Sequence, residues 1–365
     1  MRIGIYAPNM ATSAPSGVER YIVELLRALA RRPSAHEVAL ITDSPDLPLP
    51  AGGRRVSVRS MGRAARLWFD HCRLARVARE EKLDLLHCAK SFVPSGLDCP
   101  SVATVYDVIF LKRGELYPFW WKAYWTRALR ASMERATAVV AISEFTARDV
   151  ETLLPAARGK VQAVRSGVNP SAFASTDDEA RKRREAKGVP TSYFLCVGNL
   201  TRRKNLPVLL DAFASVREAT GAALVVAGAL DYGADELMRR FQEPGVTYLG
   251  RVDDALLAAL YRGALAFVYP SSEEGFGLPV LEAMASGAPV IATTGGALPE
   301  AVGDAGLLVA PGSVAELAQA MRRIAAEPAL RSDVVTKGTR RVAEHSWDRT
   351  AEETVRVYEK AAARR

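Results

Sequence analysis

The sequence contains few of the side chains that bind metals or form disulfides. It has four cysteines and four histidines in 365 residues. Cys72, Cys88, Cys99 and Cys196 show no C-x-x-C spacing, so they predict neither a disulfide framework nor a zinc site. No Asp-x-Asp triplet occurs, and the histidines are not at ligand spacing. We therefore expect no catalytic metal and no bound cofactor.

Long hydrophobic stretches are also missing. There is no run of about 18 uninterrupted apolar residues, and no apolar leader with a cleavage site follows Met1. Apolar residues make up 49% and charged residues 25% of the sequence, a balance that is typical of globular proteins and excludes disordered and fibrous ones. At about 150 residues per domain, the length favours two domains. We expect a cytoplasmic protein.

Positive charge is concentrated in the first half of the chain. Residues 1–170 hold 25 Lys and Arg against 16 Asp and Glu (25 − 16 = +9), and the remainder carries 24 − 25 = −1. Such an asymmetry suits an anionic partner, namely a nucleic acid, an acidic membrane surface or a phosphorylated substrate. A solvated arginine-rich surface explains it equally well.

Short β-branched runs alternate with helical patterns along the whole chain, which predicts α/β architecture with parallel sheets. Seven strand candidates precede a polar stretch rich in helix breakers, and six follow it. One long helix is expected over 64–82. We predict two Rossmann-like domains facing a cleft, with these boundaries: 1–170, a linker at 171–191, 192–345, and a helix at 346–365 that could cross back to the first domain.

The most informative motif is the loop and helix start around Glu-Gly-Phe-Gly-Leu-Pro, residues 274–279. It follows a buried strand, so it lies at the carboxyl edge of a parallel sheet, where such sheets bind ligands. Gly275 and Gly277 permit a tight loop, and the backbone N–H groups of the first helical turn attract anions or hydroxyls. Glu274 and Glu282 flank this loop and can accept hydrogen bonds from sugar hydroxyls. Taken singly, Glu282 is better explained as a structural residue favoured by the helix dipole.

A second motif joins a buried strand to a cationic turn. Gly198 ends the strand, and Arg202, Arg203 and Lys204 precede the next helix. A guanidinium and an ammonium at a strand's carboxyl edge suit a pyrophosphate. Three adjacent cations more often form only a solvated loop, but this turn and Glu274 follow strands of the same predicted sheet.

The loop after the first strand leads through Gly17 into a helix, which would direct backbone N–H groups toward a phosphate. Alone this signal is weak. Neither the dinucleotide pattern G-x-G-x-x-G nor the mononucleotide pattern G-x-x-x-x-G-K-[ST] occurs.

Together these features resemble the family-4 retaining glycosyltransferases of the GT-B fold, which include bacterial lipopolysaccharide and capsule mannosyltransferases. The resemblance covers nearly the whole chain. Its most specific part is the spacing of Glu274 and Glu282 within the Glu-Gly-Phe-Gly-Leu-Pro motif. Gly295-Gly296 and Pro299-Glu300 also follow the family pattern.

The resemblance implies a nucleotide-sugar donor, with GDP-mannose favoured over a UDP-sugar, and front-face transfer in which the diphosphate helps to take the acceptor's proton. Arg203 and Lys204 would bind the diphosphate, Glu274 the donor-sugar hydroxyls and Glu282 the ribose. The other implied donor contacts are Gly17, Gly198, Gly275, Phe276, Gly277 and Leu278. Tyr106 and Asp107 stand where many members have a His-Asp pair near the donor sugar, so they are candidates for acceptor or sugar contact.

A segment at 117–125 holds three of the five tryptophans and is followed by Arg127 and Arg130. An aromatic and basic helix of this kind can rest at a lipid headgroup boundary. Packing of residues 117, 121 and 125 in a core is at least as good an explanation. We expect a glycan acceptor, lipid-linked at the inner membrane face, as in surface polysaccharide synthesis. The alternatives are a nucleotide-sugar epimerase and a nucleic-acid-binding protein.

Overall fold

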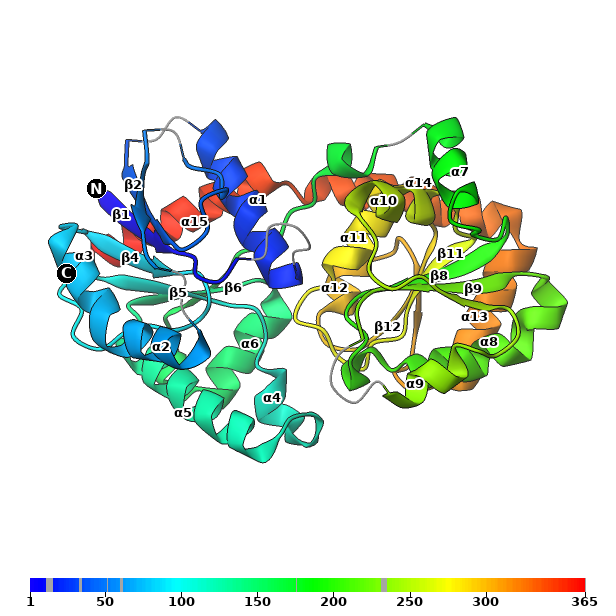
Figure 1. The fold of residues 1–365 in the computed structure, drawn as a ribbon, viewed down its shortest axis with the longest axis horizontal. Coiled ribbons are helices and arrows are strands. Elements are labelled where there is room, and N and C mark those ends of the chain that lie inside the picture. The colour runs from blue at the N-terminus through cyan, green and yellow to red at the C-terminus, as the bar shows by residue number, and fades with distance from the viewer. Residues whose placement is uncertain are drawn as a thin grey trace. The chain divides into compact units, whose positions relative to one another are not determined.

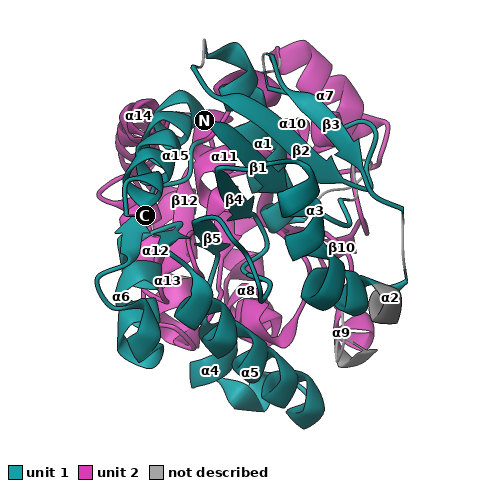
Figure 2. Ribbon diagram, turned by 90° about the vertical axis from the view of Figure 1, so that its left-hand side faces the viewer, with its two compact units in different colours: residues 1–167, 347–365 teal, residues 168–346 magenta. Residues whose placement is uncertain are grey.

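The fold is seen in a computed structural model that describes residues 1–10, 16–32, 35–50, 52–59, 62–174, 176–230 and 235–364. The chain divides into two compact units (Figures 1 and 2). Unit 1 comprises Met1–Gly167 and Trp347–Arg365, and unit 2 comprises Val168–Ser346. Each unit is built on one parallel sheet with helices on both faces, which confirms the predicted α/β class with two Rossmann-like sheets.

Unit 1 contains a parallel sheet with the order β3-β2-β1-β4-β5-β6-β7 within the described residues. The strands are β1 (Arg2–Tyr6), β2 (Glu37–Thr42), β3 (Arg54–Ser57), β4 (Leu85–Cys88), β5 (Ser101–Val105), β6 (Ala138–Ala141) and β7 (Val161–Ala163). β1 pairs with β2 on one side and with β4 on the other, so the direction of strand progression reverses between β1 and β4. In open α/β sheets, ligands bind outside the carboxyl ends of the strands at this point.

The helices of unit 1 begin where short polar side chains cap them. Ser16 and Glu19 form a reciprocal capping box at the start of one helix, and Ser143 caps another. The helices are α1 (Gly17–Arg31), α2 (Arg63–Trp68), α3 (Leu74–Glu80), α4 (Ile109–Lys112), α5 (Phe119–Arg135), α6 (Glu144–Leu153) and α15 (Trp347–Ala362), with a π-helical turn at Phe69–Arg73 and 3-10 turns at Gly114–Leu116 and Pro155–Ala157.

The expected helix over 64–82 is wrong in one respect, because the structure divides it. The π-helical turn Phe69–Arg73 separates α2 from α3. This wider turn carries Asp70, whose carboxylate accepts hydrogen bonds from Tyr6 at the end of β1 and from Arg66 of α2. The polar contacts at this sheet edge therefore coincide with the interruption of the α-helical pattern.

Helix α15 comes from the C-terminal end of the chain and packs in unit 1, where Figure 2 colours it with β1 and α1. Its Trp347 ring meets Tyr21 of α1 edge to face at 5.3 Å. Its Tyr358 hydroxyl lies 2.7 Å from Nδ1 of His87, a fully buried residue of β4. The other ring nitrogen of His87 lies 2.7 Å from the hydroxyl of Thr104. This buried polar chain ties α15 to the sheet.

Unit 2 repeats the arrangement with the order β10-β9-β8-β11-β12-β13 within the described residues. Its strands are β8 (Tyr193–Val197), β9 (Ala223–Ala227), β10 (Val246–Tyr248), β11 (Ala266–Tyr269), β12 (Val290–Thr293) and β13 (Leu307–Val309). The reversal of strand progression falls between β8 and β11, which pair in parallel. Both strands are almost entirely buried, in keeping with their continuous apolar sequences.

The helices of unit 2 cover both faces of this sheet (Figure 1). They are α7 (Asp177–Glu185), α8 (Leu206–Thr220), α9 (Asp235–Arg240), α10 (Asp254–Gly263), α11 (Leu278–Ala285), α12 (Leu298–Val302), α13 (Val314–Ala326) and α14 (Pro328–Glu344), with 3-10 turns at Pro170–Phe173 and Arg202–Lys204. The stretch expected as a linker, 171–191, lies within unit 2. Its helix α7 packs against α10, where Arg184 donates to the Ala259 carbonyl at 2.9 Å.

None of the described helices combines the length and the apolar composition needed to cross a bilayer.

Candidate active site

The candidate active site lies at the carboxyl edge of the unit 2 sheet. The loop after β8 carries Arg203 and Lys204, and the loop after β11 carries Glu274. Because β8 and β11 are parallel neighbours at the reversal point, their loops emerge side by side. Backbone contacts join the loops, since Ser272 donates its N–H to the carbonyl of Arg203 at 2.9 Å.

Three charged side chains meet between these loops, and we call Arg203, Lys204 and Glu274 the charged trio. The ammonium of Lys204 donates to Oε1 of Glu274 at 2.7 Å. The guanidinium of Arg203 forms an ion pair with Oε2 of the same carboxylate. Arg203 also donates to the carbonyl of Glu273 at 2.8 Å, which fixes its orientation. One carboxylate thus holds two cations at one position.

Burial makes these interactions stronger than surface ion pairs. Lys204 and Glu274 are each 7% exposed. Burial alone would raise the pKa of Glu274, but Arg203 and Lys204 outweigh it and lower that pKa to about 2. Burial lowers the pKa of Lys204, and Glu274 partly restores it. The carboxylate is therefore ionised at neutral pH, and the trio carries a formal charge of +1 with Lys204 protonated.

Tyr269, the last residue of β11, completes the surroundings of Lys204 and was not predicted as a site residue. Its hydroxyl contacts the Lys204 ammonium, which also lies 4.4 Å from the centroid of the Tyr269 ring. A tyrosine at the end of a buried apolar strand carries no motif. The signal that could have indicated Tyr269 is that a buried tyrosine hydroxyl needs a polar partner. At the end of this strand, that partner is a loop residue.

Two glycines shape the loops around Glu274. Gly277 has φ +119° and directly precedes α11 as its N-cap residue. Gly296 has φ +68° and runs beside the backbone of Glu274. A Cβ at Gly296 would lie 2.3 Å from the Glu274 carbonyl oxygen, so only glycine allows this approach. Gly198 lies next to the side chain of Lys204, and Gly275 is buried within the loop.

Helix α11 holds the other predicted donor residues. Glu282 is 6% exposed and lies beyond the first turn, and the Tyr261 hydroxyl donates to its Oε2 at 3.4 Å. The ring of Phe276 is buried and lies 5.7 Å from the ring of His345, so this side chain packs inside unit 2. Leu278 is half-buried at the start of the helix. Only the backbone of Phe276 is therefore suited to ligand contact.

The remaining predicted residues belong to unit 1. Gly17 is the first residue of α1, and a Cβ there would meet nothing within 4 Å, so packing does not require the glycine. The Tyr106 hydroxyl donates to the Ala89 carbonyl at 2.8 Å, and its ring meets Tyr21 edge to face. Asp107 accepts from the N–H of Ile109 at 3.2 Å, at the start of α4. These contacts hold Tyr106 and Asp107 within unit 1.

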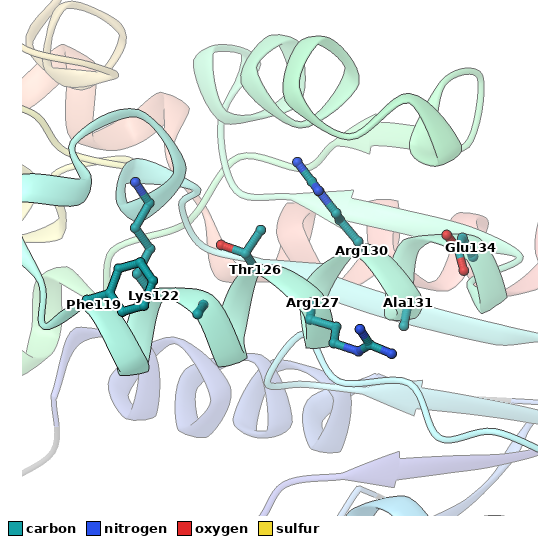
Figure 3. Close-up of a pocket in the computed structure, with 8 residues that line it drawn as sticks. Phe119, Lys122, Thr126, Arg127, Arg130, Ala131 and Glu134 are labelled. Carbon is teal, nitrogen blue, oxygen red and sulfur yellow. The ribbon is translucent and has the colours of Figure 1, made fainter.

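The aromatic segment divides between the core and the surface. Tyr117, Trp121 and Trp125 pack against the core of unit 1. Phe119 and Trp120 are 86% and 71% exposed. The outer face of α5 borders a shallow cavity of about 760 Å³, which Figure 3 shows lined along one helix by Phe119, Lys122, Ala123, Thr126, Arg127, Arg130, Ala131 and Glu134. The packing interpretation therefore holds for Tyr117, Trp121 and Trp125, and the membrane interpretation stays a prediction.

Among the residues that the structure describes, no three His, Cys, Asp or Glu side chains gather closely enough to hold a metal ion.

Comparison with known proteins places the chain in a family. Residues 191–327 match the family described as glycosyl transferases group 1, and residues 15–172 match Glycosyltransferase Family 4. The chain is 30% identical to a phosphatidyl-myo-inositol mannosyltransferase of Mycobacterium leprae, covering 99% of this chain and 97% of that protein. It is 28% identical to the O-antigen chain mannosyltransferase B of Escherichia coli, covering 78% and 77%.

A solved structure supports the fold. HepE of Anabaena, crystallised with UDP and glucose, superposes with a TM-score of 0.75 at 18% identity and covers 99% of this chain and 100% of its own. This likeness extends over both units, as the GT-B architecture requires. The family matches and the 30% identity to the Mycobacterium leprae protein show that the chain belongs to the family 4, group 1 glycosyltransferases, which are retaining hexosyltransferases of the GT-B fold.

Proposed function

We propose that this glycosyltransferase moves mannose from GDP-mannose to a lipid-linked glycan acceptor in surface polysaccharide synthesis. The mannosyltransferase relatives from Escherichia coli and Mycobacterium leprae support the sugar and a membrane-associated acceptor. The UDP in HepE makes a UDP-sugar the alternative donor. Family membership favours transfer over the epimerase and nucleic-acid-binding alternatives.

The charged trio carries the donor assignment. Arg203 and Lys204 are held in place before any ligand binds, because Glu274 and the Glu273 carbonyl fix them. Fixed cations aimed at a leaving group need no reorganisation during the reaction, and each such donor is commonly worth about 3 kcal/mol. The diphosphate would lie against these two cations, and Glu274 would accept hydrogen bonds from the donor sugar.

The backbone around α11 supports the same location. Gly277 is the N-cap residue of the eight-residue helix α11, whose first backbone N–H groups have no partners within the helix and can bind an anion. Gly198, Gly275, Phe276 and Leu278 would contribute mainly backbone, and Glu282 would bind the ribose. In unit 1, Gly17 would approach the diphosphate, and Tyr106 and Asp107 would border the sugar or the acceptor.

The reaction exchanges one bond at the anomeric carbon for another. The bond from C1 to the diphosphate oxygen breaks, and an acceptor hydroxyl oxygen bonds to C1 on the same face, which retains the configuration. The hydroxyl proton passes to the departing diphosphate. Arg203 and Lys204 stabilise the charge that grows on that group, as an electrostatic clamp.

Donor identity is tested by thermal unfolding with GDP, UDP, GDP-mannose and UDP-glucose. A ligand at 100 times its dissociation constant stabilises the folded protein by about 2.7 kcal/mol. We expect the GDP compounds to raise the Tm, and Lys204→Ala to remove this rise. A response to the UDP compounds alone would reject GDP-mannose, and no response to any nucleotide would reject the site.

The exposed face of α5 supports peripheral contact with an anionic membrane. Phe119 and Trp120 offer exposed rings, and Lys122, Arg127 and Arg130 lie along the same helix (Figure 3). Aromatic rings favour the headgroup boundary, and cations favour acidic lipids at about 1 kcal/mol each.

Vesicle sedimentation at low salt tests this contact. We expect vesicles rich in phosphatidylglycerol to retain the protein, and purely zwitterionic vesicles to release it. Exchanging Lys122, Arg127 and Arg130 for Glu should abolish retention, whereas exchanging the exposed Arg323 of α13 for Glu should not. Equal behaviour on both vesicle types would refute the membrane contact.

A further inference from the structure

Helix α12 supports the loop that carries Glu274 at two points. The N–H of Ala297, the residue before the helix, donates to the Glu274 carbonyl at 2.9 Å. Leu298, the first residue of α12, is fully buried against Gly277, where an added Cβ would come within 2.9 Å of the leucine side chain. The start of α12 therefore fixes the backbone on both sides of the loop.

Such a short helix cannot hold this position by itself. Its five residues form little more than one turn, and helices of fewer than about 12 residues are unstable in isolation. The last carbonyls of any helix have no partners within it. In α12, two of them, the carbonyls of Glu300 and Ala301, accept hydrogen bonds from one side chain, Arg341 of α14. The stability of α12 therefore depends on a residue of another helix.

The guanidinium of Arg341 fits the end of α12 closely. Its Nε donates to the Ala301 carbonyl at 3.2 Å, and one terminal nitrogen donates to the Glu300 carbonyl. The other terminal nitrogen donates to Glu344 of α14 at 2.7 Å. Gly303 ends α12 with a φ of +57°, and a Cβ there would lie 3.3 Å from Nε of Arg341. The planar fork of an arginine can satisfy two carbonyls and a carboxylate at once, which the single ammonium of a lysine does less well.

Helix α14 is itself anchored to the helix that carries Glu282. Gly338 of α14 packs against Met284 of α11, and a Cβ at Gly338 would lie 3.3 Å from Cγ of Met284. At the C-terminal end of α14, the ring of His345 lies beside that of Phe276, in the loop after β11. The backbone of α14 is thus a firm support from which its arginine can hold α12.

We propose that Arg341 is a positioning residue for the donor sugar, acting through α12 on Glu274. The guanidinium holds the C-terminal end of α12, and the N-terminal end of this helix holds the backbone of Glu274. The inference rests on the proposed function, in which Glu274 binds the sugar hydroxyls. Without Arg341, the carboxylate would no longer be held where the sugar needs it, and a displacement of about 1 Å can reduce a rate roughly a hundredfold.

A second arginine of α14 provides a matched control. Arg331 donates to the carbonyls of Ile324 and Ala325 at 2.6 and 2.8 Å, near the C-terminal end of α13. It makes the same kind of contact from the same helix, but to a helix that carries no predicted site residue. Replacing either arginine by alanine should lower the Tm by roughly 2–4 °C.

The test measures hydrolysis of saturating GDP-mannose, and calorimetric binding of GDP-mannose and GDP, with the full-length protein. Arg341→Ala should lower the hydrolysis rate roughly ten- to a hundredfold and weaken GDP-mannose binding about tenfold, with less effect on GDP, which lacks the sugar. Arg331→Ala should leave all three values at the wild-type level despite a similar loss of Tm. Arg341→Lys can still donate to a carbonyl and should recover part of the rate; it carries the test if Arg341→Ala does not fold.

A second background shows whether the effect passes through Glu274. In Glu274→Ala, the carboxylate that Arg341 would position is absent, so adding Arg341→Ala should change GDP-mannose binding by less than about twofold. Hydrogen exchange gives a readout without ligand. The Ala297 amide, which donates to the Glu274 carbonyl, should exchange faster in Arg341→Ala than in Arg331→Ala.

Two results would overturn the inference. One is a hydrolysis rate in Arg341→Ala that equals that of the wild type or of Arg331→Ala, because the contact would then contribute only stability. The other is an undiminished effect of Arg341→Ala in the Glu274→Ala background, which would mean that Arg341 acts by another route. A wild-type protein that neither binds nor hydrolyses GDP-mannose would instead reject the proposed donor. Exchange of the Ala297 amide would then decide, and equal rates in the two arginine variants would overturn the role of Arg341.

Discussion

The two units share one strand order but differ in how their carboxyl edges balance charge. In unit 2, the cations of the trio lie within direct reach of Glu274, and Tyr269 adds a hydroxyl to Lys204. In unit 1, Arg66 is as deeply buried as Lys204, yet its two terminal nitrogens lack hydrogen bonds within the described residues. The fold alone therefore does not determine the chemistry of the edge; the loops do.

A self-paired trio with one surplus positive charge suits a dianionic ligand that displaces part of the pairing. The charge balance at the unit 2 edge is therefore in line with the proposed sugar-diphosphate site.

Removing the Lys204 ammonium would eliminate one of the two cations that distinguish the unit 2 edge from the unit 1 edge. In Lys204→Ala, we expect kcat to fall roughly a hundred- to a thousandfold, because one fixed donor to the leaving diphosphate is lost. The measurement is turnover at saturating donor, with circular dichroism to check folding. The control is Lys337→Ala on α14, which loses the 2.8 Å pair of this half-buried lysine with Asp333 and should retain full turnover. Normal turnover in Lys204→Ala would contradict the site.

Acid should distinguish the units by stability. Burial lowers the pKa of His87 to about 4 from 6.5, so the folded state resists the proton that the unfolded state accepts. The contribution of the neutral His87 side chain to the free energy of unfolding should be at its maximum above pH 6.5. It should fall by about 3 kcal/mol as the pH drops toward 4. Glu274, with a pKa of about 2, keeps its charge through this range.

Hydrogen exchange at pH 7 and pH 4.5 would follow this loss element by element. We expect faster exchange in β4 and α15 at the lower pH, with β8 and β11 much less affected. His87→Leu should flatten the dependence, although loss of its two hydrogen bonds lowers stability at every pH. Equal acid sensitivity of both sheets would refute this account.

Gly296→Ala would sharpen the comparison by moving Glu274 without removing a charge. The substitution combines a positive φ with a collision of Cβ against the Glu274 carbonyl, so we expect a loss of about 1–3 kcal/mol in unfolding free energy and weaker donor binding. Gly312→Ala is the matched control, since Gly312 has φ +83° but open space around its Cβ. Equal destabilisation in chemical denaturation would show that crowding at Glu274 contributes nothing.

Tyr269→Phe is expected to have the smallest effect, because the ring remains beneath Lys204 and only the hydroxyl is lost. We expect about 1 kcal/mol less stability and a donor KM several times higher. Tyr193→Phe serves as the control, since its hydroxyl donates to the Leu260 carbonyl at 2.6 Å near the start of β8. That variant should lose similar stability and keep the donor KM. A wild-type donor KM in Tyr269→Phe would show that the ring alone holds Lys204.

Features encoded in contiguous sequence could be predicted. The buried strands are short β-branched runs, and the trio lies in two loops whose glycines and charges are adjacent in the chain. Their convergence followed from the parallel pairing of β8 and β11. The π-helical turn could not be predicted from the sequence, because residues 64–82 keep an ordinary helical pattern. A tertiary contact of Asp70 accompanies the interruption.

Other site features depend on packing that no local pattern encodes. Phe276 lies in a motif typical of ligand loops, yet its ring turns inward to His345. Tyr269 is indistinguishable in sequence from a core aromatic residue. Arg66 and Asp70 have the four-residue spacing of a helical ion pair, but Asp43 is distant in sequence, and only the folded sheet brings all three to the end of β1.

The attachment of α15 to unit 1 has a consequence for biosynthesis. Unit 2 is one continuous stretch, whereas unit 1 needs a helix that the ribosome makes only after unit 2 is complete. While translation proceeds, Tyr21 and His87 await the partners that Trp347 and Tyr358 later provide. A nascent chain released too early would therefore present an unfinished first half beside a finished second one, which is the form that chaperones and proteases would encounter.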